Sequence, residues 1–165
     1  MTNMLRSVRA AKIAAVLVAA LAMGACAKNA SQEAGALANA SAATPGSQQD
    51  FVVNVGDRVF FNSDSSELTP QSVATLDKQA QWLRSYSQYT FVIEGHADER
   101  GTREYNIALG ARRAQAVHDY LASRGVQAHR MRTISYGKER PVAVCDDISC
   151  WSQNRRAVTV LNASS

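Results

Sequence analysis

The chain has 165 residues, of which 18 are Lys or Arg and 14 are Asp or Glu, and its pI is about 9.2. This length suits one folded domain with further segments attached. Residues 1–25 contain three of the basic residues and no acidic one, so the remainder has 15 basic against 14 acidic residues. The basic balance belongs to the first segment and does not indicate a nucleic-acid-binding surface on the folded part.

Residues 1–25 have the pattern of an export signal. The charged start is followed by the apolar run Ile13–Met23, which is too short to span a membrane comfortably. Small residues then precede Cys26, which resembles a bacterial lipobox with cleavage before Cys26 and lipid on its sulfur. Ala27, in place of aspartate, favours export to the outer membrane where sorting follows the enteric rule. The alternative is an ordinary secretory signal that leaves Cys26 free or paired.

Residues 26–50 predict a flexible, lipid-bearing tether. They are rich in Ala, Ser, Gly, Gln and Asn, and Leu37 is their only large apolar side chain, so they cannot bury a core. Fully extended, residues 27–50 would reach about 80 Å. We therefore expect a signal peptide at 1–25, a linker at 26–50 and a folded domain at 51–165.

The folded domain is expected to begin with short strands at Val52–Val55 and Arg58–Phe61. A polar loop, Asn62–Leu68, follows. Thr69 and Pro70 then suit the start of a helix, as its cap and its first residue. Apolar residues continue along one face of this helix at Val73, Leu76, Ala80 and Leu83.

A second helix and three more strands complete the expected fold. The helix spans Tyr105–Arg124, and the strands are Tyr89–Glu94, Arg130–Tyr136 and Arg156–Leu161. Strands that alternate with helices predict an α/β (α+β) sandwich, in which one mixed sheet packs against two main helices.

The segment Val92–Arg113 carries the main functional prediction, since it combines a strand end, a polar loop and the start of a helix. Asp98 in the loop offers an acceptor for an ammonium group. Arg113 in the helix offers a planar fork for a carboxylate. A ligand with both groups on one carbon, such as a free amino-acid end of a peptide, would satisfy both. On spacing alone, a structural ion pair or solvated charges explain these two residues equally well.

The sequence GHADERGTREYNIALGARRA (95–114), together with NRRAV (154–158), resembles the OmpA C-terminal family of peptidoglycan-binding domains. The similarity runs from about Val55 to Leu161, and the DERGT and SYGKERPV sequences are similar to the lipoprotein branch of that family. The resemblance implies the fold predicted above. It also implies that Asp98 and Arg113 hold the D-centre of meso-diaminopimelate in the peptidoglycan stem peptide.

The resemblance implies further site residues. Asn106 and Leu109 match family positions near the ligand, and Asn62 stands where the family often has aspartate, so its backbone is the expected contact. Of the NRR triplet, one arginine is expected to support the cleft, and we assign this role to Arg156 rather than Arg155. The other polar and aromatic residues nearby are interpreted as a solvated face or as core and rim: Arg100, Arg103, Glu104, Arg112, Arg140, Tyr105 and Trp151.

By the same resemblance, the expected partners are peptidoglycan and the periplasmic propeller protein TolB, in the system that constricts the envelope at division. No cofactor, metal or nucleic acid is expected. One alternative is a lipoprotein that binds TolB but has little or no affinity for the wall, for which Asn62 is the supporting feature. The other is a cell-wall hydrolase that uses His96 and Asp98. One His–Asp pair does not make a metal site, and the sequence has no Ser-His-Asp order, so we expect a non-enzymatic protein.

Cys145 and Cys150 are separated by four residues and follow an export signal, so they suit a disulfide that closes a short ring. Free thiols are the alternative. We expect this ring in a hairpin-like loop between the last two strands, before Trp151.

Overall fold

The computed structural model describes residues 43–162. The expected signal peptide (1–25), the lipid-bearing Cys26 and residues 26–42 of the expected linker lie outside this range. Within it, no helix combines the length and the apolar character that crossing a membrane requires.

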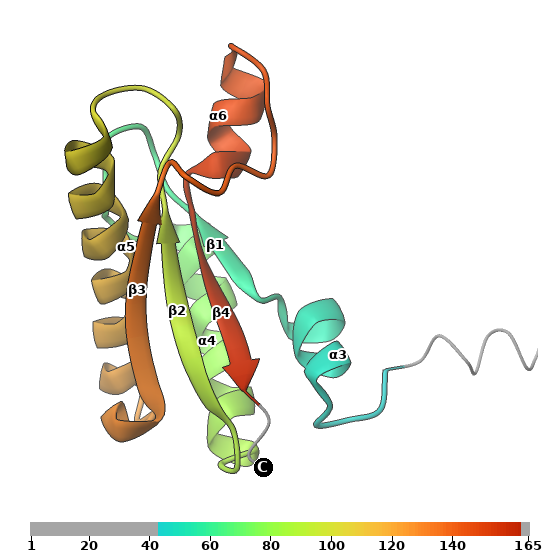
Figure 1. Ribbon diagram of the computed structural model, residues 1–165. Coiled ribbons are helices and arrows are strands. Elements are labelled where there is room, and N and C mark those ends of the chain that lie inside the picture. Colours follow the sequence, from blue (N-terminus) through green and yellow to red (C-terminus); the bar gives the residue numbers. More distant parts are fainter. Residues whose placement is uncertain (1–42, 163–165) are drawn as a thin grey trace, which may run out of the picture. The chain divides into compact units, whose positions relative to one another are not determined.

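Four strands form one mixed sheet in the order β1-β4-β2-β3 (Figure 1). They are β1 (Arg58–Phe60), β2 (Thr90–His96), β3 (Met131–Gly137) and β4 (Arg156–Asn162). Strands β2 and β3 are parallel, whereas β4 is antiparallel to both β1 and β2. The predicted mixed sheet is confirmed.

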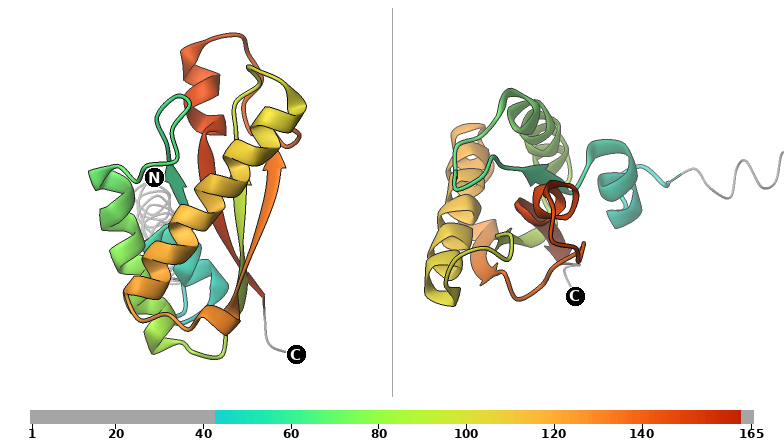
Figure 2. Two further views of the ribbon diagram at one scale, coloured as in Figure 1. Left: turned by 90° about the vertical axis from the view of Figure 1, so that its left-hand side faces the viewer. Right: turned by 90° about the horizontal axis from the view of Figure 1, so that it is seen from above.

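Two long helices, α4 (Pro70–Ser85) and α5 (Arg103–Ser123), cover one face of this sheet. Figure 2 shows them side by side over that face. As predicted, α4 begins with Pro70, and the side chain of Thr69 caps it by accepting a hydrogen bond from the backbone of Ser72. The core between helices and sheet contains fully buried Phe51, Leu76, Leu83, Ile93, Val117 and Leu121.

The predicted strand at Val52–Val55 is wrong. Gln48–Asp50 form the short helix α3, and Phe51–Val55 continue it as a π-helix, η1. Phe51 is buried in the core, whereas Val52 and Val53 face solvent, so this helix is held by one aromatic side chain rather than by an alternating face. The carboxylate of Asp50 also accepts a hydrogen bond from Trp82 Nε1 at 2.8 Å. Packing against the domain therefore begins before Phe51.

The connection between β3 and β4 is not hairpin-like, because β2 lies between these two strands in the sheet. It contains a helix that sequence analysis missed, α6 (Ile148–Asn154). Asp147 caps this seven-residue helix by accepting a hydrogen bond from the backbone of Ser149 at 2.7 Å. The predicted disulfide between Cys145 and Cys150 is present and joins the loop to α6.

Two glycines allow α5 to lie directly against the sheet. A Cβ atom on Gly95 in β2 would overlap the backbone oxygen of Gly110 in α5, and a Cβ on Gly110 would overlap the Ser135 hydroxyl of β3. This close approach fixes the first turns of α5 beside the end of β2. The loop between them, residues 97–102, is thereby held over the same end of the sheet.

Substitution Gly110→Ala is expected to lower the free energy of unfolding by about 2 kcal/mol, because the added methyl group must displace backbone and Ser135. Helix propensity alone acts in the opposite direction, since alanine favours a helix over glycine by about 1 kcal/mol. Urea unfolding measures the difference. The exposed Ala108→Gly is the control for propensity, and equal or higher stability of Gly110→Ala would contradict the packing argument.

Candidate functional site

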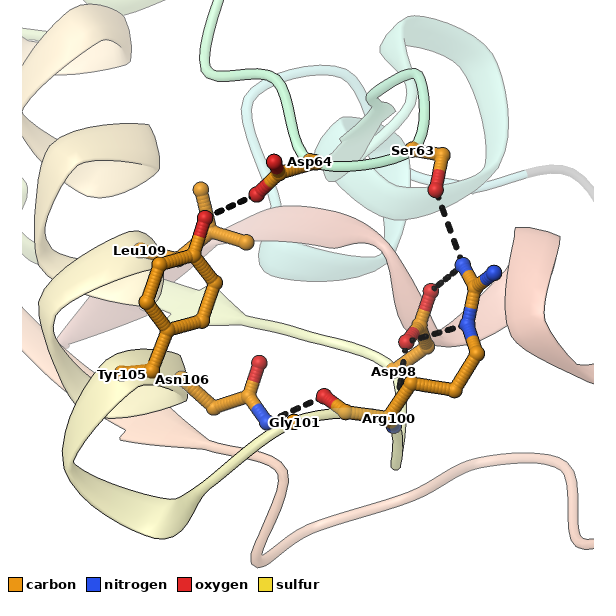
Figure 3. A pocket seen from close by; sticks show the side chains of 8 residues that line it. All are labelled: Ser63, Asp64, Asp98, Arg100, Gly101, Tyr105, Asn106 and Leu109. Atoms are coloured by element: carbon orange, nitrogen blue, oxygen red, sulfur yellow. Dashed lines mark hydrogen bonds and ion pairs between the residues drawn. The ribbon is translucent and has the colours of Figure 1, made fainter.

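A cavity of about 250 Å³ lies at the end of β2, between the loop 97–102, the start of α5 and the loop that follows β1. Figure 3 shows the side chains around it. It is lined by Ser63, Asp64, Asp98, Arg100, Gly101, Tyr105, Asn106 and Leu109. Three of the predicted site residues, Asp98, Asn106 and Leu109, are therefore brought together.

Asp98 is buried in the wall of the cavity and is held by two arginines. Arg100 donates from Nη2 to Oδ2 at 2.6 Å and from Nε to Oδ1 at 3.1 Å, and Arg155 Nη1 lies 3.4 Å from Oδ2. Desolvation alone would raise the pKa of Asp98, but the hydrogen bonds and charge of Arg100, with Arg155, outweigh it and hold that pKa below its usual value. The carboxylate is ionised at neutral pH.

Arg100 was predicted to lie on a solvated face; its side chain is exposed, but it also binds Asp98, which the sequence analysis did not predict. Its fork binds the Asp98 carboxylate, while its Nη2 also donates to the hydroxyl of Ser63 at 2.9 Å. The side chain remains 44% exposed, so a guanidinium group is presented to the cavity from the loop. The residue two positions from Asp98 can reach it because the backbone N–H of Arg100 also bonds Asp98, which closes a local turn.

Arg113 is completely buried and does not line the cavity. Its guanidinium donates to three backbone carbonyls: from Nε to Ser65 at 2.8 Å, from Nη1 to His96 at 2.8 Å and from Nη2 to Asn62 at 3.1 Å. Burial lowers the pKa of Arg113 to about 10, so it still carries its charge at pH 7. Three of its five N–H groups are thus occupied, and one remains on each Nη atom. Asp98 and Arg113 make no direct ion pair in this arrangement.

The side chain of Asn106 bonds the loop 97–102 and does not point into the open part of the cavity. Its Nδ2 donates to the Arg100 carbonyl at 2.7 Å, and the side chain is 2% exposed. Leu109, one turn later in α5, supplies an apolar part of the lining. The backbone carbonyl of Asn62 accepts a hydrogen bond from Arg113, and Asn62 lines a neighbouring cavity rather than this one.

The structure places Arg155, not Arg156, beside Asp98. Arg155 Nε also donates to the carbonyl of Phe61 at 3.1 Å. Arg156 donates instead to the carbonyls of Asn154 and Arg140, and it lines neither of these two cavities. Arg155 is the C-cap residue of α6, whereas Arg156 is the first residue of β4, and the two side chains bond different groups.

Sequence reasoning missed Asp64 as a lining residue. Its φ is +55°, a conformation that Asp and Asn adopt more readily than most residues. Its carboxylate accepts a hydrogen bond from the hydroxyl of Tyr105, which is 44% exposed at the rim. The cavity therefore presents two carboxylates, Asp64 and Asp98, and no short motif in the sequence connects them.

The segment between β3 and β4, which contains α6, contacts the loop 97–102 and fixes its position. The Arg100 guanidinium lies over the Trp151 ring, 4.3 Å from its centroid, and Trp151 Nε1 donates to Glu99 at 2.8 Å. Lys138 Nζ donates to the carbonyls of Glu99 and Gly101 at 3.0 and 2.7 Å. These contacts fix the loop, and with it the position of Arg100.

His96 does not form a catalytic pair with Asp98. Its ring is 2% exposed, and neither ring nitrogen makes a hydrogen bond within the described residues. Desolvation, with the positive charges of Arg156 and Arg140, lowers the pKa of His96 to about 4, so its 3.5 Å approach to Glu94 is not an ion pair at pH 7. Over residues 43–162, no three His, Cys, Asp or Glu side chains converge as a metal site would require.

This fold and this cavity define the class of protein. The sequence model of the OmpA family matches residues 60–157, and the chain belongs to that family, which is not a family of enzymes. Over nearly its whole length, the chain is also similar to proteins named peptidoglycan-associated lipoprotein. It is 67% identical over 153 residues to that of Rhizobium meliloti, covering 92% of this chain and 87% of the relative. It is 63% identical to that of Brucella melitensis, covering 97% of each chain.

Solved structures agree with the fold. The crystal structure of the peptidoglycan-associated lipoprotein from Burkholderia pseudomallei is 45% identical, with a TM-score of 0.63, and the match covers 64% of this chain and 90% of that one. The C-terminal domain of Helicobacter pylori MotB has a TM-score of 0.62 at 21% identity, covering 66% of this chain and 86% of that one. The second likeness concerns the fold alone.

The buried His96 is expected to make stability depend on pH. Between pH 6.5, the usual pKa of the unfolded side chain, and about 4, the unfolded chain binds a proton that the folded chain does not, so stability falls as pH falls. Wild type should lose about 3 kcal/mol more than His96→Gln between pH 7 and pH 4. Urea unfolding at the two pH values measures this. The exposed His129→Gln serves as the control, and equal losses in wild type and His96→Gln would contradict the prediction.

Loss of the disulfide is expected to loosen the brace above the cavity while leaving the sheet intact. Cys145→Ser with Cys150→Ser should lower the free energy of unfolding by about 2 kcal/mol, the value for a ring of this size. Amide hydrogen exchange should accelerate in residues 138–154 and in the loop 97–102, but not in β2 or the centre of α5. Faster exchange spread evenly over the sheet would show that the disulfide supports the whole domain instead.

Proposed function

We propose that this protein is an outer-membrane lipoprotein that binds the diaminopimelate-containing stem peptide of peptidoglycan without covalent chemistry. The observation that supports this most is the mixture of charges in one small cavity. Asp64 and Asp98 supply negative charge, and Arg100 supplies positive charge beside them. A group that carries an ammonium and a carboxylate on one carbon matches both signs. The similar proteins from Rhizobium meliloti and Brucella melitensis are named for their association with peptidoglycan.

In this proposal, Asp98 accepts the ammonium of diaminopimelate and Arg113 acts on its carboxylate. Asp98 is already desolvated and ionised, so an incoming cation needs only to share it with Arg100. Arg113 is fully buried and does not line this cavity, so it acts on the carboxylate through its charge from behind the wall rather than by direct contact. Arg100 lines the cavity and is the second candidate for the carboxylate.

The remaining site residues position the loop and Arg113 or supply apolar contact. Asn106 holds the loop through the Arg100 carbonyl, Leu109 supplies apolar contact, and the carbonyl of Asn62 positions Arg113. Arg155 takes the supporting role that we had assigned to Arg156, because it contacts Asp98 directly. The number of such contacts is small, so affinity for one stem peptide should be on the order of micromolar or weaker.

Attachment to the wall follows from many such weak contacts. Lipid on Cys26 would anchor each copy in the outer membrane, and the chain up to residue 42 would allow the domain to reach the wall. Copies held in one membrane face one continuous mesh, so effective concentration compensates for modest affinity. The domain would lie in the periplasm and connect the outer membrane to the wall.

We further propose TolB as a protein partner, within the Tol–Pal system that constricts the envelope at cell division. This rests on the similarity to the peptidoglycan-associated lipoproteins, of which the chain is a homologue. The competing proposal is a lipoprotein that binds TolB alone. It is favoured by one observation, that Asn62 lines the neighbouring cavity and adds no carboxylate to the first.

Sedimentation with purified sacculi tests the wall-binding proposal. Asp98→Asn removes the charge but keeps the size of the side chain. Because the ammonium group of the ligand loses its charged partner, the Kd derived from the bound fraction should rise at least tenfold. Asp119→Asn, on the exposed face of α5, is the matched control and should bind as wild type does.

Urea unfolding of both variants separates a binding defect from a folding defect. Equal sedimentation of Asp98→Asn and wild type would refute the assignment of Asp98. A wild-type protein that fails to sediment but still captures TolB would favour the competing proposal. Muropeptides released from the sacculi would contradict the non-enzymatic assignment.

A further inference from the structure

The face of the sheet that α4 and α5 do not cover is open over most of its length, and Figure 1 looks onto it. Within residues 43–162, no helix packs on this open face, and the segment between β3 and β4 crosses it only at the end of β2. Side chains alternate between the two faces of a strand. In β2, Phe91 and Ile93 are buried in the core on the helical side, so Val92 and Glu94 lie on the open face.

Four apolar side chains form a patch across three strands of the open face. Val92 in β2 is paired with Val160 in β4, and Glu94, two residues further on, is paired with Val158 in β4 and with Ile134 in β3. Val160 and Ile134 are 38% and 41% exposed, and the two other apolar side chains are half-buried. Covering such a patch removes apolar surface from water, which favours the binding of a partner.

Arginines lie around this apolar patch. Arg132 in β3 is exposed and forms no ion pair within the described part of the chain. Arg58 in the edge strand β1 is also exposed, and it bonds Asp57 at 2.8 Å. Arg140, which follows β3, is exposed, and its guanidinium lies 3.5 Å from the centroid of the Tyr136 ring. The patch is therefore bordered by guanidinium groups that solvent can reach.

The open face carries more positive than negative charge. Arg156 in β4 adds a fourth guanidinium, which is 4% exposed and whose Nε has no hydrogen-bond partner within residues 43–162. Two carboxylates lie among the arginines, and the side chains of these residues, Asp57 and Glu94, are only 15% and 21% exposed. Glu139 bonds Arg103 of α5 instead. Four arginines against two largely covered carboxylates leave the face positive.

An apolar patch bordered by arginines suits an anionic phospholipid surface. Apolar side chains enter the boundary between headgroups and acyl chains, while arginine side chains extend to the phosphate groups around them. Anionic lipids attract basic residues that lie near the membrane surface. A second copy of the chain would instead bring the same arginines against each other, and like charges in one interface are unfavourable.

We propose that the open face of the sheet docks on an anionic phospholipid membrane, through a contact of the folded domain that is separate from the lipid anchor. This rests on the proposed function, because lipid on Cys26 keeps the domain beside a membrane. Residues 27–42 reach at most about 55 Å when fully extended, so the membrane stays within reach of the domain. The patch and its arginines do not line the cavity at the end of β2, so the two binding surfaces are distinct.

Methyl NMR of the mature lipidated protein in phospholipid nanodiscs tests this proposal. The discs contain phosphatidylglycerol and a lipid with a spin label on its headgroup, which accelerates the relaxation of nearby methyl groups. Isoleucine labelling suits the chain, since Ile134 lies on the open face and Ile107 lies in α5 on the other side of the sheet. We expect the Ile134 methyl to relax faster than the Ile107 methyl, and this difference to shrink strongly in discs of uncharged phosphatidylcholine.

Arg132→Glu reverses one charge beside the patch and changes no core residue. Two charge units are altered, so the ratio of docked to free domain should fall roughly 25-fold, because each unit near an anionic surface changes it about fivefold. The Ile134 methyl should then relax as slowly as the Ile107 methyl. Arg84→Glu, at an exposed position of α4, makes the same change in charge and is the control that should behave as wild type does.

Equal relaxation of the two methyl groups in wild type, while the protein stays in the discs, would overturn docking on lipid in favour of a protein partner. It would leave the lipid anchor and the proposed function intact. Unchanged relaxation of Ile134 in Arg132→Glu, or in phosphatidylcholine discs, would also overturn the proposal, because the arginines would then have no part in the contact. A protein that elutes apart from the discs would instead overturn the proposed lipid anchor, and the docking proposal with it.

Discussion

The site depends on one buried cation. Arg113 donates to carbonyls of two segments, residues 62–65 after β1 and His96 at the end of β2, and so connects the two walls of the cavity. Burying a guanidinium is costly unless its N–H groups are paired, and three backbone oxygens pair three of the five here. The position of Arg113 is set in turn by the contact between Gly95 and Gly110, which holds α5 against the sheet. The packing of the core therefore also sets the geometry of the site.

Local patterns predicted most of the fold because each element has its own signal. The cap at Thr69 with Pro70, the apolar face of α4 and the alternation in β2 all gave the observed elements. The prediction was wrong at η1 because three valines predict a strand. Burial of Phe51 and the hydrogen bond from Trp82 to Asp50 stabilise a helix there instead. Helix α6 was not predicted because seven residues are too few for a helical period to be recognised.

The sequence predicted several residues of the candidate site but not the hydrogen bonds that join them to distant segments. Asp98, Asn106 and Leu109 lie together because they share one continuous segment, the end of β2 and the start of α5. Contacts between distant segments could not be read from spacing, and these include Arg155 with Asp98 and Tyr105 with Asp64. Arg100 was misjudged for a related reason, since an exposed loop arginine resembles a solvated one until the turn that folds it onto Asp98 is known.

The position of the disulfide has a consequence for how the protein matures. The chain has three cysteines, and under the proposed acylation of Cys26 only Cys145 and Cys150 keep free thiols. A single intramolecular pairing is then available, so the exported chain needs an oxidant but no isomerase to correct scrambled bonds. Because the two cysteines lie five positions apart, their encounter does not wait for distant strands to assemble.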